Sequence, residues 1–332
     1  MRHRPIDNAK PDDLAPFCLH HRQLIFILAM LCLCFSYTGT QNASGETIRV
    51  MSFNLWHGGD AGKQPLTQSV AVIKAAKADI VGLQETNGAA GSNGIRPDRG
   101  AEIAKLLGWD YVDQGDRTGI ITRFKIVGTT PRKWGAKIRL PSGKFVYHFN
   151  VHFASSPYQP YQLLKIPYGD APFITTEQEA IRFANATRQH SVGAMLAEAR
   201  AIRNANNAVF ITGDFNEPSH LDWTPAAVGA KLCPLKVDWP TTKTVTDAGF
   251  VDTFRATYPD PVRNPGMTWT PITSPQDPKD HHDRIDFVFA SESKNVKVIA
   301  TQVIGESKQN AHVVVKPYPS DHRAVVAEIE VN

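Results

Sequence analysis

Cysteine is scarce in this chain, which has only four cysteines among its 332 residues. Three of them, Cys18, Cys32 and Cys34, lie before residue 40, so the remainder holds Cys233 alone. One thiol excludes an intramolecular disulfide in that remainder, and a chain of this length can bury enough apolar surface without one. Because no activating group stands beside Cys233 in the sequence, we interpret it as a small packed residue and not as a nucleophile.

A strong excess of one charge is also missing. The formal net charge is +4. Residues 1–40 contain four basic and three acidic side chains and account for +1, which leaves +3 for the rest of the chain. This is too little to make a broad nucleic-acid-binding surface by itself. The charge therefore does not select a class of substrate.

No hydrophobic run reaches the roughly 20 residues that a membrane-spanning helix needs. The run 24–35 follows basic residues up to Arg22 and precedes the small or polar Ser36, Thr38 and Gly39. This pattern is typical of a signal peptide, with cleavage expected within 36–45. We therefore expect residues 1–40 to direct the protein out of the cytoplasm, as a secreted or periplasmic protein. The alternative is an uncleaved N-terminal membrane anchor formed by residues 24–37.

Short apolar segments alternate with helical patterns from residue 45 onward, without a repeat, a low-complexity tract or a long linker. Leu66, Val70 and Ile73 have the spacing of one helical face, and a long helix is expected over 177–203. A shorter helix over 101–107 should end at Gly108. Strands are expected over 47–54, 79–84, 119–122, 144–153, 208–212, 285–290, 296–303 and 322–329. This order predicts one α/β domain over residues 45–332.

The segment 144–153 alternates between apolar and polar residues. Phe149 and Val151 fall on one face of the expected strand, and His148, Asn150 and His152 fall on the other. We expect the first face to pack a core and the second to present polar groups along a line. A stretch rich in proline and tyrosine, 155–176, follows directly and predicts a long structured loop. That loop either forms a wall of the polar edge or only covers the edge of the core.

Polar residues recur at the ends or the starts of the apolar segments. The sequence reads FNLW at 53–56, GLQE at 82–85, NVHF at 150–153 and GDFN at 213–216. Two further clusters, DRIDFVF from 283 and SDH from 320, open strands. A carboxylate at a buried strand end is unfavourable unless it is paired or binds a metal. If the strands align these termini at one rim, the clusters predict a cleft where carboxylates, amides and imidazoles meet.

This ordered set of motifs resembles the signature set of the endonuclease/exonuclease/phosphatase superfamily, the group with the DNase I-like fold. The resemblance extends over about residues 47–330. It implies an α/β (α+β) four-layer sandwich, in which two packed mixed β-sheets are flanked by helices and the site lies at one rim.

The resemblance also assigns roles to individual residues. Asn54, Glu85 and Asp321 match positions that hold or support a metal, and such oxygen ligands suit Mg²⁺, with Mn²⁺ or Ca²⁺ as substitutes. The catalytic residues that it implies are His152, Asp214, Asn216, Asp286 and His322. Asp286 is expected to hold His322, and His152 is a candidate general acid. Candidate substrate contacts are Arg123, Trp269, His57 and His281, each of which has a plain structural alternative.

These roles predict a metal-dependent phosphodiesterase that acts by in-line attack of water, without a covalent intermediate. A small diester, a nucleic acid and a phospholipid headgroup all remain open as the phosphoester substrate, so a DNA or RNA endonuclease and a sphingomyelinase-like hydrolase are the alternatives. An abasic-site endonuclease is disfavoured, because Asp116-Arg117-Thr118 stands where that branch carries a tyrosine. A non-catalytic binding module is a remote alternative, and no protein partner is implied.

Overall fold

The computed structural model describes residues 45–332, so the signal peptide or anchor expected in residues 1–40 lies outside the described part. The described residues form two β-sheets. The first has seven strands in the order β12 (Val313–Val314), β11 (Val296–Gly305), β13 (Ala324–Val331), β1 (Glu46–Asn54), β2 (Ile80–Gln84), β4 (Thr118–Thr122) and β3 (Asp110–Gly115). The second has six strands in the order β5 (Lys125–Thr129), β6 (Gly135–Arg139), β7 (Phe145–His152), β8 (Ala208–Asp214), β10 (Asp286–Ser291) and β9 (Phe250–Asp252).

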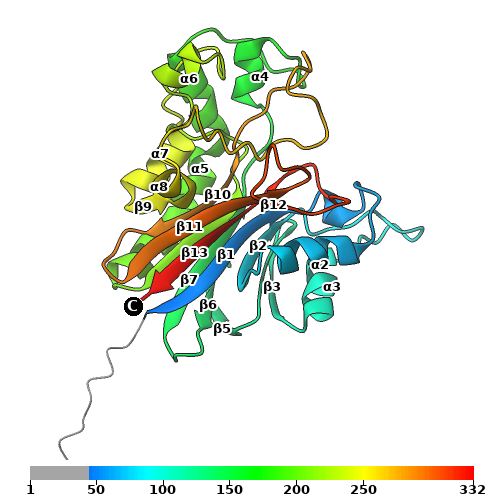
Figure 1. Cartoon of the computed structure of the whole chain (residues 1–332), viewed down its shortest axis with the longest axis vertical. Coiled ribbons are helices and arrows are strands. Elements are labelled where there is room, and N and C mark those ends of the chain that lie inside the picture. The colour runs from blue at the N-terminus through cyan, green and yellow to red at the C-terminus, as the bar shows by residue number, and fades with distance from the viewer. Residues whose placement is uncertain (1–44) are drawn as a thin grey trace, which may run out of the picture. The chain divides into compact units, whose positions relative to one another are not determined.

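Helices cover the outer face of each sheet (Figure 1). The helices α2 (Leu66–Ala75) and α3 (Arg99–Leu107) pack on the first sheet through Ile73 and Ile103. On the second sheet, α5 (Glu177–Asn204) and α7 (Pro240–Asp247) pack through Leu196 and Val245. The apolar core between the sheets contains side chains such as Val50 and Phe210. The predicted four-layer sandwich is therefore confirmed.

A fourth apolar cluster lies at one end of the sandwich. It joins α4 (Gln159–Leu164), α6 (Pro225–Gly229) and the first turns of α5, with Trp223, Cys233 and Trp239 in its interior (Figure 1). Burial raises the pKa of the Cys233 thiol to about 12, which agrees with a packed and unreactive residue. Two short helices complete the described elements, η1 (His57–Gly59) and α8 (Thr253–Thr257). Among the helices of residues 45–332, none has both the length and the apolar character needed to cross a bilayer.

The polar face of β7 differs from its prediction. His148 and Asn150 do not line an open edge: both are buried and face the first sheet. His148 is hydrogen-bonded to Thr212 of β8, and burial lowers its pKa to about 3, so its ring is neutral. Here the two sheets approach closely, because a Cβ at Gly82 of β2 would collide with Asn150 and Thr212. Only His152, at the end of the strand, reaches the rim.

Strand direction explains why the polar motifs meet at one rim. β1 and β2 are parallel, as are β7 and β8, so in each pair both strands end at the same edge of their sheet. β10 and β13 run antiparallel to these strands and therefore begin at that edge: Asp286 pairs with Asp214, and β13 begins at Ala324, two residues after His322 of the SDH motif. A hydrogen bond from Asn54 Nδ2 to Asp214 Oδ2, 3.0 Å long, joins the edges of the two sheets.

Candidate active site

The rim contains a pocket of about 360 Å³. Six residues that the sequence singled out for catalysis or metal binding line it: Glu85, His152, Asp214, Asn216, Asp321 and His322. Asn54 and Asp286 lie directly behind them and are hydrogen-bonded to Asp214 and His322. The predicted cleft is thus present, and its groups come from the ends of strands in both sheets.

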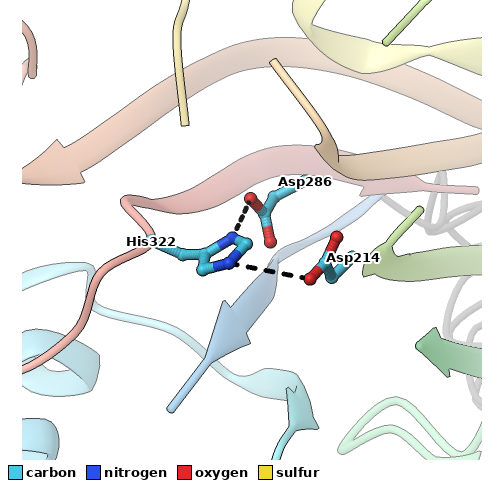
Figure 2. A group of neighbouring side chains, drawn as sticks. All are labelled: Asp214, Asp286 and His322. Carbon is cyan, nitrogen blue, oxygen red and sulfur yellow. Dashed lines mark hydrogen bonds and ion pairs between the residues drawn. The ribbon is translucent and has the colours of Figure 1, made fainter. Parts of the chain in front are cut away.

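His322 lies between two carboxylates (Figure 2). Its Nδ1 donates to Asp286 Oδ2 at 2.9 Å, and its Nε2 lies 3.7 Å from Asp214 Oδ2. The ring is buried, which disfavours its charge, but the carboxylates of Asp286 and Asp214 outweigh this effect and raise the pKa of His322 to about 10. Asp286 is itself fixed by its backbone N–H, which donates to Thr268 Oγ1. His322 is therefore an imidazolium at neutral pH, with its charge next to the pocket.

Asp214 is oriented by three neighbours. Its Oδ2 accepts from Asn54 Nδ2 at 3.0 Å, and its Oδ1 accepts from the backbone N–H of Asn216 at 2.9 Å. His152 Nε2 lies 3.5 Å from Asp214 Oδ2 and 4.0 Å from Glu85 Oε1. These contacts hold the carboxylate of Asp214 between the two histidines, where it can accept a proton from a bound water.

Asn54, predicted to hold or support a metal, makes two hydrogen bonds behind the pocket. Its Oδ1 accepts from the backbone N–H of Trp56 at 2.9 Å, and its amide group points to Asp214. These two hydrogen bonds fix the Asn54 side chain, whose amide group in turn positions Asp214.

Glu85 and Asp321 are the carboxylates best placed for a divalent cation. Glu85 Oε2 accepts from the backbone N–H of His57 at 2.8 Å, and burial is offset by this bond and by nearby histidines, so the pKa of Glu85 is lowered. Asp321 Oδ1 is buried and has no hydrogen-bond partner within residues 45–332. Burial and the nearby Glu85 charge raise the pKa of Asp321 to about 7, although His322 opposes them. An orphaned buried oxygen facing a second carboxylate fits a hard cation.

A second group, Asp214, Asp286 and His322, also has ligand atoms within 4.8 Å of one another. Both ring nitrogens of His322 face carboxylates, however, and a protonated imidazole has no lone pair to give a metal. This group therefore fits a cation less well than Glu85 and Asp321 do, and its imidazolium presents positive charge to the pocket.

The backbone is strained around the pocket. Trp56, His57, Glu85 and Asn216 all line it, and all have a positive φ, between 49° and 56°. Non-glycine residues adopt this left-handed region at a cost and do so mainly where the surroundings force them, which is frequent at functional sites. The strain aims the Glu85 carboxylate and the Asn216 amide into the pocket instead of along their strands.

Aromatic side chains form the wall opposite the carboxylates. Tyr158 and Tyr161 pack edge to face at 4.9 Å, and Tyr161 and Tyr168 do so at 5.8 Å. Trp269 packs edge to face on His322 at 5.0 Å. The stretch 155–176 therefore forms a wall of the polar edge, as one of its two interpretations predicted, but it contains the helix α4 and also contributes Leu163 to the cluster behind it.

Two aspartates of one loop orient this wall. Asp280 Oδ1 accepts from Tyr161 Oη at 2.5 Å and from Trp269 Nε1 at 3.0 Å. Asp283 accepts from Tyr158 Oη at 2.7 Å and from Trp223 Nε1 at 2.9 Å. The rings are thereby held with their polar atoms turned away from the pocket and their apolar surfaces toward it.

Two predicted substrate contacts are corrected. Arg123 lies at the opposite end of the first sheet, because β4 is antiparallel to β2, and it pairs with Asp79 at 2.6 Å. His281 lies behind the aromatic wall, packed against Trp223 and 3.6 Å from Asp283. Trp269 and His57 do line the pocket.

Sequence reasoning missed several lining residues. Arg117 reaches the pocket from the β3–β4 turn, and Tyr158, Tyr161 and Tyr168 come from the loop that was recognised only as a whole. Asp280 was not considered. The many tyrosines in 155–176 were the sequence signal for the aromatic wall. A single arginine in a turn, such as Arg117, gives no comparable signal.

Comparisons with known proteins agree with this geometry. The sequence model of the endonuclease/exonuclease/phosphatase family matches residues 51–322. An uncharacterized protein of Caenorhabditis elegans is 28% identical over 328 residues, which cover 92% of this chain and 98% of that protein.

Two solved structures share the fold. An endonuclease/exonuclease/phosphatase from Beutenbergia cavernae is similar with a TM-score of 0.55 and 17% identity, over 86% of this chain and 72% of that one. The 3′ phosphatase NExo from Neisseria, in a complex with a product DNA hairpin, gives a TM-score of 0.53 and 16% identity, over 84% and 98% of the two chains.

Proposed function

Because the chain belongs to the endonuclease/exonuclease/phosphatase family, whose members hydrolyse phosphate esters, we propose that it is an exported, divalent-metal-dependent phosphodiesterase. The observation that carries the proposal is the convergence of carboxylates and imidazoles from both sheets on one pocket. Export rests on the sequence pattern of residues 1–40 alone.

The reaction would be an in-line attack of water on phosphorus. Asp214, held by Asn54 and by the Asn216 backbone, accepts the proton of the attacking water. The imidazolium of His322 faces the negative charge that grows on the phosphoryl oxygens, and Asp286 keeps it charged throughout. His152 lies within reach of the departing oxygen and donates a proton to it.

Glu85 and Asp321 would hold the metal, since their oxygens suit Mg²⁺ or Mn²⁺. When bound, such a cation supplies Lewis-acid stabilisation of phosphoryl charge. The cation would also reduce the repulsion between the two carboxylates. It would supply a partner for Asp321 Oδ1, which is buried and has no hydrogen-bond partner among residues 45–332.

A diester substrate is supported by the shape of the pocket. Besides the charged groups, the pocket is lined by Tyr161 and Trp269 of the aromatic wall and by Trp56 and Arg117. An esterified group can rest on the apolar ring surfaces while the phosphate lies among the charged groups.

The test is hydrolysis of bis-p-nitrophenyl phosphate by the purified full-length chain with Mg²⁺ or Mn²⁺, with and without EDTA. We expect metal-dependent turnover that EDTA abolishes and that falls at least about 100-fold in His322→Ala, as when a main electrostatic group is removed. Asp247→Asn, on the exposed side of α7, is the matched control and should retain full activity. Equal rates with and without EDTA, or a folded and fully active His322→Ala, would contradict the proposal.

A further inference from the structure

A second hollow, of about 180 Å³, adjoins the catalytic pocket and shares His152 with it. It lies between the turn that joins β3 to β4 and the turn that precedes β6. Arg132, Lys133 and Trp134 line it from one side and Asp116 from the other. Arg117, in the same turn as Asp116, lines the catalytic pocket, so the two spaces meet along this turn and His152.

One side chain fixes the two turns to each other. Gln114 Nε2 donates to the carbonyl oxygens of Lys133 at 3.0 Å, of Trp134 at 2.8 Å and of Asn150 at 3.1 Å. Gln114 Oε1 accepts from the Asn150 side chain at 2.9 Å, which ties the pair of turns to β7. Hydrogen bonds to β7, the strand that carries His152, therefore fix the two turns that line the hollow.

The backbone of both turns is strained. Asp116, Arg117 and Lys133 have φ values of 47°, 61° and 58°, in the left-handed region that non-glycine side chains rarely adopt. Such conformations need support from their surroundings, and here the hydrogen bonds of Gln114 supply part of it. Their effect is to place Arg117 and Lys133 at the border of the two spaces, where Arg132 also lies.

The hollow carries cationic side chains that have no acidic partner. Arg117, Arg132 and Lys133 are exposed, and none of them forms an ion pair in the part of the chain from residue 45 to the C-terminus. By contrast, Arg123 and Lys125, which follow in the sequence, are each paired with an aspartate. With Arg117 at its border, the hollow has three cations beside two carboxylates: Asp116, which lines it, and Glu198, whose Oε1 accepts from the backbone N–H of Arg132 at 3.0 Å. The hollow therefore favours an anionic group.

We infer that this hollow is a second phosphate subsite, which binds a phosphate group next to the scissile one through Arg132 and Lys133. The inference rests on the proposed function, since it concerns the same substrate. A guanidinium and an ammonium can each form a charge-assisted hydrogen bond to phosphate oxygens, and these are stronger than hydrogen bonds between neutral groups. Because the hollow adjoins only one side of the catalytic pocket, one esterified group of the diester carries the second phosphate.

The substrates for the test are three dinucleotides: dithymidine monophosphate, the same molecule with a 5′-terminal phosphate, and the same molecule with a 3′-terminal phosphate. Rates are measured with Mn²⁺ and the full-length chain. We expect one of the two phosphorylated forms to have a KM at least about tenfold below that of the parent, which corresponds to one charge-assisted contact, with kcat little changed. Rising salt should reduce this advantage, because both cations are exposed.

The double variant Arg132→Gln, Lys133→Gln removes both charges with little change in size. It should abolish the KM advantage while leaving the hydrolysis of bis-p-nitrophenyl phosphate and of the parent dinucleotide within about twofold of the unchanged enzyme. Lys297→Gln, at the far end of the first sheet, is the matched control and should keep the advantage.

The outcomes separate the two levels of the proposal. If bis-p-nitrophenyl phosphate is cleaved but the three dinucleotides share one KM, the subsite is overturned and the phosphodiesterase stands. An advantage that survives in the double variant also overturns the subsite. If no diester is cleaved under any metal condition, the proposed function fails, and the subsite fails with it.

Discussion

Replacement of Asp286 by asparagine tests the charge of His322 directly. The Asp286 carboxylate accepts the Nδ1 proton at 2.9 Å and is the nearest group that raises the pKa of His322 to about 10. Without it, burial still lowers this pKa and only Asp214, at 3.7 Å, and Asp321 raise it, so the pKa of His322 falls toward its ordinary range.

The size of the effect follows from the fraction of protonated rings. At pH 8 a group with a pKa of 6.5 is charged in about 3% of molecules, whereas a group with a pKa of about 10 is charged in nearly all. If the imidazolium is the active form, Asp286→Asn loses about 30-fold in kcat/KM at pH 8, about fourfold at pH 7 and little below pH 6. A further loss in kcat/KM, equal at every pH, is expected because the neutral asparagine orients the His322 ring less firmly than the carboxylate does.

The assay is a pH profile of kcat/KM with bis-p-nitrophenyl phosphate, together with an NMR titration of the His322 ring in both proteins. Asp247→Asn, outside the site, is the control and should follow the profile of the unchanged enzyme. A deficit that is the same at every pH, or a His322 titration unchanged by the substitution, would refute the reasoning.

Three other perturbations probe other parts of the molecule. Hydrogen bonds from Arg323 outweigh burial and lower the pKa of Glu306 to about 2. This carboxylate therefore stabilises the fold fully above about pH 4.5 and loses that contribution as the pH falls through 2. By urea unfolding, Glu306→Gln should lower the free energy of unfolding by about 2–3 kcal/mol at pH 7 and by progressively less below pH 4.5. Asp280→Ala frees Trp269 and should raise KM for aromatic diesters at least about fivefold, with kcat changed less; an unchanged KM would remove the wall from substrate binding. Asp321→Asn should raise the Mg²⁺ concentration for half-maximal activity at least about tenfold, and an unshifted activation curve would exclude Asp321 as a ligand.

Most of the fold was predictable because its signals are local. The buried segments that became β1, β2, β8 and β10 are short apolar runs, and the helical face of Leu66, Val70 and Ile73 forms α2 as expected. The alternation in β7 was assigned correctly as a strand, but the environment of its polar face was not. From the alternation, His148 and Asn150 were expected to present polar groups along a line. Both are buried, because the opposite sheet packs over them, and the pattern within one strand cannot show this.

The candidate site was predictable where residues follow strands and unpredictable where they lie in turns. His152 and Asp214 occupy strand ends, whose direction fixes the rim at which they meet. Arg123 was assigned to the site because it also follows a strand, but the antiparallel pairing of β4 sends it to the other end. Arg117, in the turn before that strand, lies at the pocket instead, because the two arginines flank opposite ends of β4.

The division of the catalytic groups between two sheets makes turnover depend on how those sheets dock. Glu85 and His322 belong to one sheet and His152 and Asp214 to the other, so a small sliding of one layer over its partner pulls the reacting groups out of register while each layer stays intact. At Gly82 the two sheets are in close contact, because any side chain there would strike Asn150 and Thr212. Gly82→Ala would push the two sheets apart at a residue that does not line the pocket. The rate of hydrolysis should then fall before a spectroscopic measurement of secondary-structure content shows any change.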